Sequence, residues 1–416
     1  MTSLIQSNET FRSLFFSRIF NEFGASLFNI AFLVYAASYT NATLYISLAA
    51  LTATLPNFLP ALVGFMSDRT RDKKRALFLS SWVQTGLFVV MAFLIGFHSM
   101  PIFLICCLIN LIADLLAYYK AGLQMPIIQK RVAAEEMQSA FGLFQGLGSA
   151  FQLIGQPLGV ALLALFQNSF MSLSLINAAS YFISGLVLLR SRKYLDIDYQ
   201  PSEEKIDFNL KKIWQNILLI FEKDGGSQAT SLIVSALLMN FIANGMLAMI
   251  EIAMQDYNPF GNNYGFAVMV FNVTFSLGLL LGSLFVKDFL KKASLRAVVT
   301  ITFIFFFFFA LSLTRFGMLA VLVLFIIGYT FSKLNPKLSS YMMEVISSDN
   351  LAKIAGSINT LFASCSSIGV MVFVASANLM GVQQTLVLLS VLALLTFLYL
   401  IFTNVLKLGR GREILK

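Results

Sequence analysis

A carboxyl group inside a long apolar run is the first candidate for chemistry in this sequence. Asp114 lies near the centre of an apolar segment at 102–123, and Asn110 and Tyr118 stand four residues to either side. Residues four apart share one face of a helix. An ionised side chain at membrane depth costs about 2.5–3.5 kcal/mol, so it is a functional candidate. We predict that Asp114 carries a proton and that Asn110 and Tyr118 line a substrate cavity. The alternative is a carboxyl that hydrogen-bonds to a neighbouring helix.

Two further polar pairs lie in apolar runs. Arg18 and Glu22 are four residues apart in the first run, at 14–37. They are expected to form an internal ion pair, unless Arg18 extends to the water interface. Glu22 is therefore the second candidate for a proton-carrying group. Asn240 and Asn244 share a face in the run at 230–253, where they line the cavity or hold helices together.

The elements that must position these groups follow from composition. The chain has 416 residues, of which 58% are hydrophobic and 12% charged, with 42 Phe. Soluble globular proteins are closer to half apolar and a quarter charged. A soluble fold has no place for so much apolar surface, whereas a bilayer does. We therefore expect an all-α membrane protein.

Apolar runs separated by short polar breaks predict twelve transmembrane helices. They lie at 14–37, 43–66, 76–97, 102–123, 140–166, 171–189, 230–253, 264–286, 297–314, 317–338, 352–375 and 385–402. The connection between the ninth and tenth helices is the shortest and consists of Arg315 and Phe316.

Charge in the breaks orients the helices. The breaks after helices 2, 4, 6, 8 and 10 and the C-terminus are rich in Lys and Arg. Of the Lys and Arg residues, the opposite breaks contain only Arg315. Basic loops remain in the cytoplasm, so both termini are predicted to be cytoplasmic. The net charge of +9 then reflects topology, and we expect no nucleic-acid partner.

The chain divides into two similar halves. A polar linker at 191–229 separates an N-terminal six-helix bundle, 1–190, from a C-terminal one, 230–416. Within the linker, apolar residues at helical spacing from Leu210 to Phe221 predict an amphipathic helix at the membrane interface. Helices 5 and 11 share identities at one offset of 214 residues. The pairs are Gly142/Gly356, Leu147/Leu361, Ile154/Ile368 and Gly155/Gly369.

The most specific motif follows the second run: Gly64, Asp68, Arg69 and Lys73 in a basic loop. It resembles the signature loop of the major facilitator superfamily, Gly-x-x-x-Asp-Arg with a basic cluster. The resemblance implies twelve helices in two six-helix pseudo-repeats, with the substrate site between them. It also implies that these four residues form a conformational latch against helix 11; the alternative is an ordinary stop-transfer loop. The second-half counterpart keeps Gly282 but has Val286 at the Asp position.

Other segments point to one branch of that family. Gly155, Pro157 and Gly159 resemble the Gly-Pro segment of helix 5 in drug/proton antiporters, where a proline permits a bend; plain helix packing is the alternative. The stretches 11–24 and 118–132 resemble bacterial macrolide-efflux and siderophore exporters. Many proton antiporters have an Arg in helix 4, which this chain lacks, so the coupling chemistry stays open.

These features predict a proton-coupled secondary transporter that exports amphipathic small molecules, such as a drug, a macrolide-like compound, a siderophore or a peptide, by alternating access. The sequence has no P-loop for ATP. We expect no cofactor, no metal and no enzymatic activity, and a monomer in a bacterial plasma membrane whose partners are a small-molecule substrate, protons and lipid. The alternatives are a nutrient importer of the same fold, a membrane-embedded enzyme, and a non-transporting scaffold or sensor.

Overall fold

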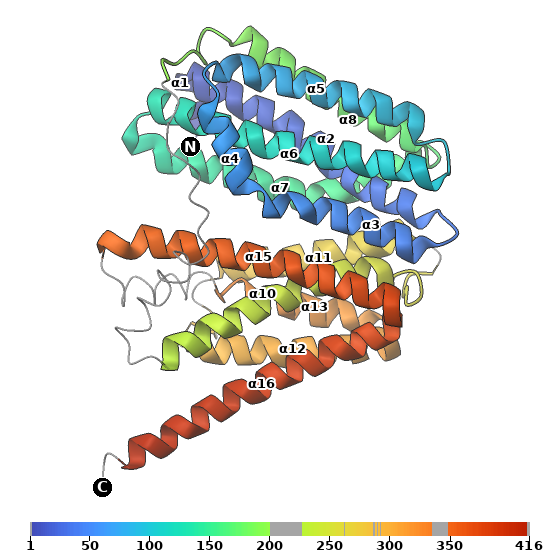
Figure 1. The fold of residues 1–416 in the computed structure, drawn as a ribbon, viewed down its shortest axis with the longest axis vertical. Coiled ribbons are helices and arrows are strands. Elements are labelled where there is room, and N and C mark those ends of the chain that lie inside the picture. Colours follow the sequence, from blue (N-terminus) through green and yellow to red (C-terminus); the bar gives the residue numbers. More distant parts are fainter. Residues whose placement is uncertain are drawn as a thin grey trace. The chain divides into compact units, whose positions relative to one another are not determined.

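The computed structural model describes residues 2–199, 227–334 apart from 262, 286, 287, 289 and 292, and 348–413. Across these residues the secondary structure is helical and contains no strand. The chain forms two compact units, Met1–Phe208 and Asn209–Lys416 (Figure 1). The interfacial helix predicted between Leu210 and Phe221 lies outside the described residues.

Each unit is a bundle of long apolar helices. In unit 1 they are α1 (Thr2–Ser7), α2 (Glu9–Ala37), α3 (Ala42–Thr54), η1 (Leu55–Phe58), α4 (Pro60–Arg69), α5 (Lys73–Leu94), α6 (Met100–Arg131), α7 (Ala134–Leu165) and α8 (Phe170–Arg190). In unit 2 they are α10 (Ser227–Ala253), α11 (Tyr264–Leu284), α12 (Leu295–Phe316), α13 (Met318–Phe331), α15 (Ser348–Met380) and α16 (Val382–Glu413).

The described helices account for the twelve predicted spans. Ten are long and apolar enough to cross a membrane, a bent pair provides the second span, and Met318–Phe331 is a shorter apolar helix. The second span is not the single helix that the sequence predicts, because it bends by 50° around η1. Pro56 and Pro60 lie at this break, and proline removes a backbone donor from the helix. The ninth and tenth spans divide at Gly317, whose φ of +47° favours glycine.

Equivalent glycines make equivalent helix contacts in the two units. Gly155 of α7 lies against Ser26 of α2, and a Cβ added to it would overlap that side chain. Gly369 of α15, at the repeat position, lies in the same way against the backbone of Phe241 on α10. Small residues permit such close approach between membrane helices. The weak sequence repeat therefore corresponds to a repeated packing of span 5 on span 1 and of span 11 on span 7.

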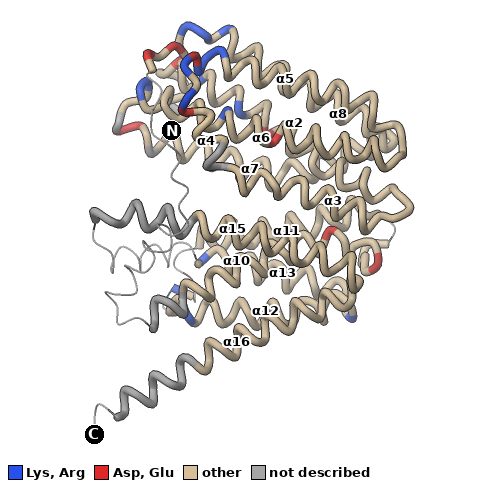
Figure 2. The backbone as a smooth tube through the Cα atoms, viewed as in Figure 1, with Lys and Arg blue, Asp and Glu red and all other residues tan. Residues whose placement is uncertain are grey.

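The breaks predicted to lie on one side of the membrane meet at one end of unit 1. Lys74 pairs with Asp196 at 2.8 Å, Arg131 donates to the Asp196 carbonyl, and Thr10 donates to the Tyr194 carbonyl at 2.8 Å. These contacts join the N-terminal segment, the α4–α5 and α6–α7 connections and the segment after α8. Figure 2 shows Lys and Arg of this unit gathered there. The alternation of basic and neutral breaks thus agrees with the fold of this unit.

Candidate functional site

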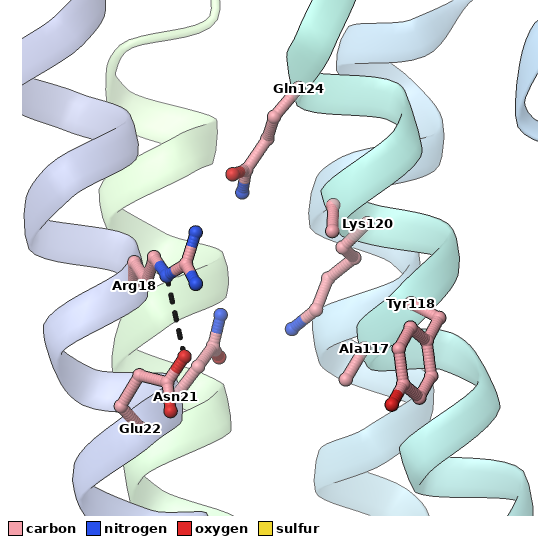
Figure 3. A pocket seen from close by; sticks show the side chains of 8 residues that line it. Arg18, Asn21, Glu22, Ala117, Tyr118, Lys120 and Gln124 are labelled. Atoms are coloured by element: carbon pink, nitrogen blue, oxygen red, sulfur yellow. Dashed lines mark hydrogen bonds and ion pairs between the residues drawn. The ribbon is translucent and has the colours of Figure 1, made fainter. Parts of the chain in front are cut away.

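A cavity of about 200 Å³ lies between α2 and α6 in unit 1 (Figure 3). Eight residues line it, six of them with polar side chains: Arg18, Asn21, Glu22, Ala117, Tyr118, Lys120, Ala121 and Gln124. The two helices are 29 and 32 residues long, so they carry these polar side chains far from at least one of their ends. The lining includes two cationic groups and one carboxylate, so the cavity has an excess of positive charge.

Arg18 and Glu22 form the ion pair that their spacing predicts. The Nε atom of Arg18 lies 3.3 Å from Oε1 of Glu22, one turn along α2. The Arg18 guanidinium also lies 5.0 Å from the centroid of the Phe144 ring on α7, a favourable position for a cation. Both side chains of the pair remain partly exposed, so ligand and water have access to them.

Lys120 is a basic residue of this cavity that the sequence did not predict as a site residue. The apolar run ends near residue 123, which places Lys120 at the end of a predicted span. Helix α6, however, continues to Arg131, and Lys120 is only 3% exposed. Its Nζ donates to Ser81 Oγ at 3.3 Å and lies 5.2 Å from the centroid of the Tyr181 ring. The signal available in the sequence was a lysine inside the predicted span at 102–123.

A second cavity, of about 380 Å³, lies between α2 and α7. Its lining is Glu22, Ala25, Ser26, Asn29, Gly148, Phe151, Gln152 and Gln156. Glu22 contributes to both cavities. Two buried oxygens in these linings, Asn21 Oδ1 and Gln156 Oε1, have no hydrogen-bond partner among the described residues. Buried acceptors without a donor are costly, so each cavity offers a place for a ligand with N–H or O–H groups.

Asn110, Asp114 and Tyr118, the three residues predicted to share one face of α6, differ in their exposure and contacts. Asn110 is buried, Asp114 is half-buried, and Tyr118 is exposed at one edge of the α2–α6 cavity. The Tyr118 hydroxyl donates to Asn57 Oδ1 of η1 at 2.6 Å, which ties α6 to the bend of the second span. Asp114 lines neither of the two cavities described above.

The two predicted asparagines of α10 form hydrogen bonds within this helix, and Asn244 also bonds to α15. Asn240 Nδ2 donates to the Ala236 carbonyl at 2.9 Å. Asn244 Nδ2 donates to the Asn240 carbonyl and to Ser366 Oγ of α15, both at 3.0 Å. This placement agrees with the helix-holding alternative for Asn244.

The residues of the signature loop surround the end of α4. Asp68 and Arg69 are exposed, and the Arg69 guanidinium lies 4.0 Å from the Phe65 ring centroid. Lys73 is buried; its Nζ donates to the Ser67 carbonyl at 2.8 Å and lies 3.7 Å from the Tyr199 ring centroid. Lysine thus caps the carbonyl end of the second span. A Cβ added to Gly64 would meet nothing within 4 Å inside the described residues.

The Gly-Pro segment lies within a continuous helix. Pro157 is inside α7, which runs unbroken from Ala134 to Leu165. A Cβ on Gly159 would lie 2.7 Å from the Leu27 carbonyl oxygen of α2. In unit 1 the segment therefore permits close packing of α7 on α2. Among the described residues no group of His, Cys, Asp and Glu has the arrangement of a metal site.

The helical fold agrees with the protein family that the sequence matches. Residues 14–370 match the Major Facilitator Superfamily. The chain belongs to this superfamily. It is accordingly a multi-pass membrane protein and a secondary transporter, and the predicted fold class is confirmed.

Relatives of this facilitator agree with that assignment. It is 24% identical over 337 residues to the uncharacterized MFS-type transporter YkuC of Bacillus subtilis (strain 168), covering 78% of this chain and 72% of the relative. Among solved structures it resembles a peptide transporter, POT, in complex with sulfate, with a TM-score of 0.70, 13% identity, and 95% and 94% of the two chains covered. It also resembles the nucleoside transporter NupG, with a TM-score of 0.67, 14% identity, and 95% and 99% covered. At such low identity these structures establish the fold alone.

Proposed function

We propose that this facilitator is a proton-coupled exporter of amphipathic small molecules and that Glu22 is its coupling carboxyl. The observation that supports this assignment is that Glu22 lines both cavities of unit 1 while it pairs with Arg18. Protonation of Glu22 removes the charge that holds Arg18, so a proton changes the electrostatics of the site where a substrate binds. A coupling group requires this link, because proton and substrate must alter each other's affinity.

The linings support an amphipathic substrate. Phe151 and Tyr118 offer aromatic surface, and the partnerless oxygens of Asn21 and Gln156 accept hydrogen bonds. Pockets of this kind bind apolar bodies and orient them by a few polar groups. Export is proposed from the resemblance of the Gly155, Pro157 and Gly159 segment to drug/proton antiporters. Macrolide-like compounds, siderophores and peptides remain within the proposed substrate range.

The test compares Glu22→Gln with Asp114→Asn. Each variant is reconstituted in proteoliposomes with the best-transported member of a panel of amphipathic compounds. Glu22→Gln should keep substrate counterflow, because the amide preserves size, but lower pH-gradient-driven accumulation by about tenfold or more, equivalent to about 1.4 kcal/mol of lost coupling. Asp114→Asn should retain accumulation. The reverse pattern would transfer the proton-carrying role to Asp114.

Uptake of a solute is the second candidate, and one observation favours it. The α2–α6 cavity holds Arg18 and Lys120 but only one carboxylate, Glu22. A proton on Glu22 makes this cavity more positive, so an anionic solute binds together with the proton and not against it. That sign of coupling belongs to symport. Transport measured in inverted and right-side-out vesicles separates uptake from export.

A further inference from the structure

Lys120 is a buried lysine for which the described residues provide no carboxylate at ion-pair distance. Its Nζ makes one long hydrogen bond, to Ser81 Oγ at 3.3 Å, and lies near the Tyr181 ring. An ammonium group has three donors, so this environment leaves part of its capacity unused. Burial of an ammonium group without a partner is unfavourable. A group that arrives only during transport would supply the missing partner.

The donors of this cavity converge on one space. In Figure 3 the Lys120 ammonium extends from α6 toward α2, and the Arg18 guanidinium extends from α2 toward α6. The Gln124 amide, one turn further along α6, points into the same space; Gln124 is 5% exposed. Ala117 and Ala121 leave room between these long side chains. Cationic and amide donors that converge from two helices fit a compact oxyanion.

We propose that the α2–α6 cavity binds a carboxylate of the transported molecule between Lys120 and Arg18, with Gln124 as a further donor. The proposal rests on the second candidate function, uptake together with a proton, and names the substrate class of its site: a small amphipathic molecule with a carboxylate. The aromatic and amide groups of Phe151, Gln152 and Gln156, in the α2–α7 cavity on the other side of Glu22, would contact the rest of the molecule.

The carboxylate and Glu22 share Arg18. When Glu22 is ionised, its pair with Arg18 at 3.3 Å competes with the substrate for the guanidinium. When Glu22 is protonated, Arg18 is free to bind the substrate. Removal of the Glu22 charge should therefore raise the affinity for the carboxylate.

The experiment measures binding to the purified full-length protein in an uncharged detergent. The probes are 3-phenylpropionate, indole-3-acetate and 4-phenylbutyrate, each compared with its primary amide by thermal unfolding over a range of probe concentrations. We expect the wild type to bind the carboxylates about tenfold more tightly than the amides. Lys120→Gln should abolish this preference. The matched control is Lys130→Gln, an exposed lysine of the same helix that bonds to the Asp198 carbonyl, and it should keep the preference.

Two further variants keep the proposal testable if Lys120→Gln does not fold. Lys120→Arg should preserve the preference because it keeps the charge, and Arg18→Gln should weaken it. Glu22→Gln should bind the carboxylates more tightly than the wild type, because Arg18 then has no carboxylate pair in this cavity. A wild type that binds carboxylates and amides equally, or a Lys120→Gln variant that keeps the preference, would overturn the proposal. The assay uses no gradient, so failure of proton coupling or a different direction of transport would leave its outcome unchanged.

Discussion

Lys333 Nζ lies 2.9 Å from Asp288 Oδ2 and donates to the Phe285 carbonyl at 2.6 Å, so one lysine both pairs with an acid and caps the end of α11. In unit 1 the equivalent cap of the second span comes from Lys73, which donates to the Ser67 carbonyl. The two units thus cap corresponding helix ends with lysines from different segments. In the second half Val286 stands at the Asp position of the signature loop, and the lysine that caps α11 comes from the residues just after α13.

This cluster predicts a pH-dependent contribution to stability. Burial raises the pKa of Asp288, but hydrogen bonds from Tyr329 and Lys333 outweigh it and hold the pKa below its ordinary value. A carboxyl with a depressed pKa in the folded state stabilises above its unfolded pKa and loses this effect as pH falls through the folded value. Asp288→Asn should therefore cost about 1–3 kcal/mol at pH 7.

The measurement is the melting temperature of wild type and variant in detergent at several pH values. The difference between them should shrink below about pH 4, where the ordinary aspartate titrates. Asp256→Asn, at an exposed position, is the control and should change little. An equal deficit for Asp288→Asn at all pH values would exclude the ionised pair as its cause.

The exposed Asp68 is predicted to act in transport and not in folding. Asp68→Asn should insert and accumulate normally but transport several times more slowly, because it removes the charge of the proposed latch. Asp72→Asn is the matched control: Asp72 caps α5 by accepting from the Arg75 amide at 3.0 Å, and asparagine caps equally well. Transport rates are compared at equal protein abundance. Wild-type transport by Asp68→Asn would remove the latch from consideration.

Gly159 is predicted to be required for the packing of α7 on α2. A Cβ at this position would lie 2.5 Å from the Ile30 side chain, so Gly159→Val should destabilise unit 1 by about 1–3 kcal/mol. Gly146→Ala, on the same helix with open space around it, should be neutral. Melting temperatures of the two variants provide the comparison. Equal stability would mean that α7 is free to move away from α2.

The Lys- and Arg-rich loops between the spans predict which side of the membrane each loop faces. Reporter fusions after Arg75 and after Lys193 should read as cytoplasmic, and a fusion at Asn41 as external. The contacts that join the α4–α5 connection to the segment after α8 require the first two fusions to agree with each other. An external signal at Arg75 would reverse the whole topology.

By itself the sequence predicted the fold class, most of the spans and the superfamily. These are local properties: a membrane helix must satisfy its backbone groups within about twenty apolar residues, and basic residues resist translocation. The spacing of Arg18 and Glu22 likewise predicted their ion pair, because residues four apart on a helix always neighbour each other. The weak 214-residue repeat was informative for the same reason, since each repeat is built from its own helices.

The tertiary structure alone decided which polar groups meet. Asp114 stands at the middle of its apolar run, yet the rotation of α6 in the bundle turns Lys120, Tyr118 and Gln124 toward the cavity beside α2. The continuation of α6 to Arg131 places Lys120 inside the unit and not at a helix end. Helix rotation and helix length beyond the apolar run depend on packing against other helices. No pattern within one segment contains that information.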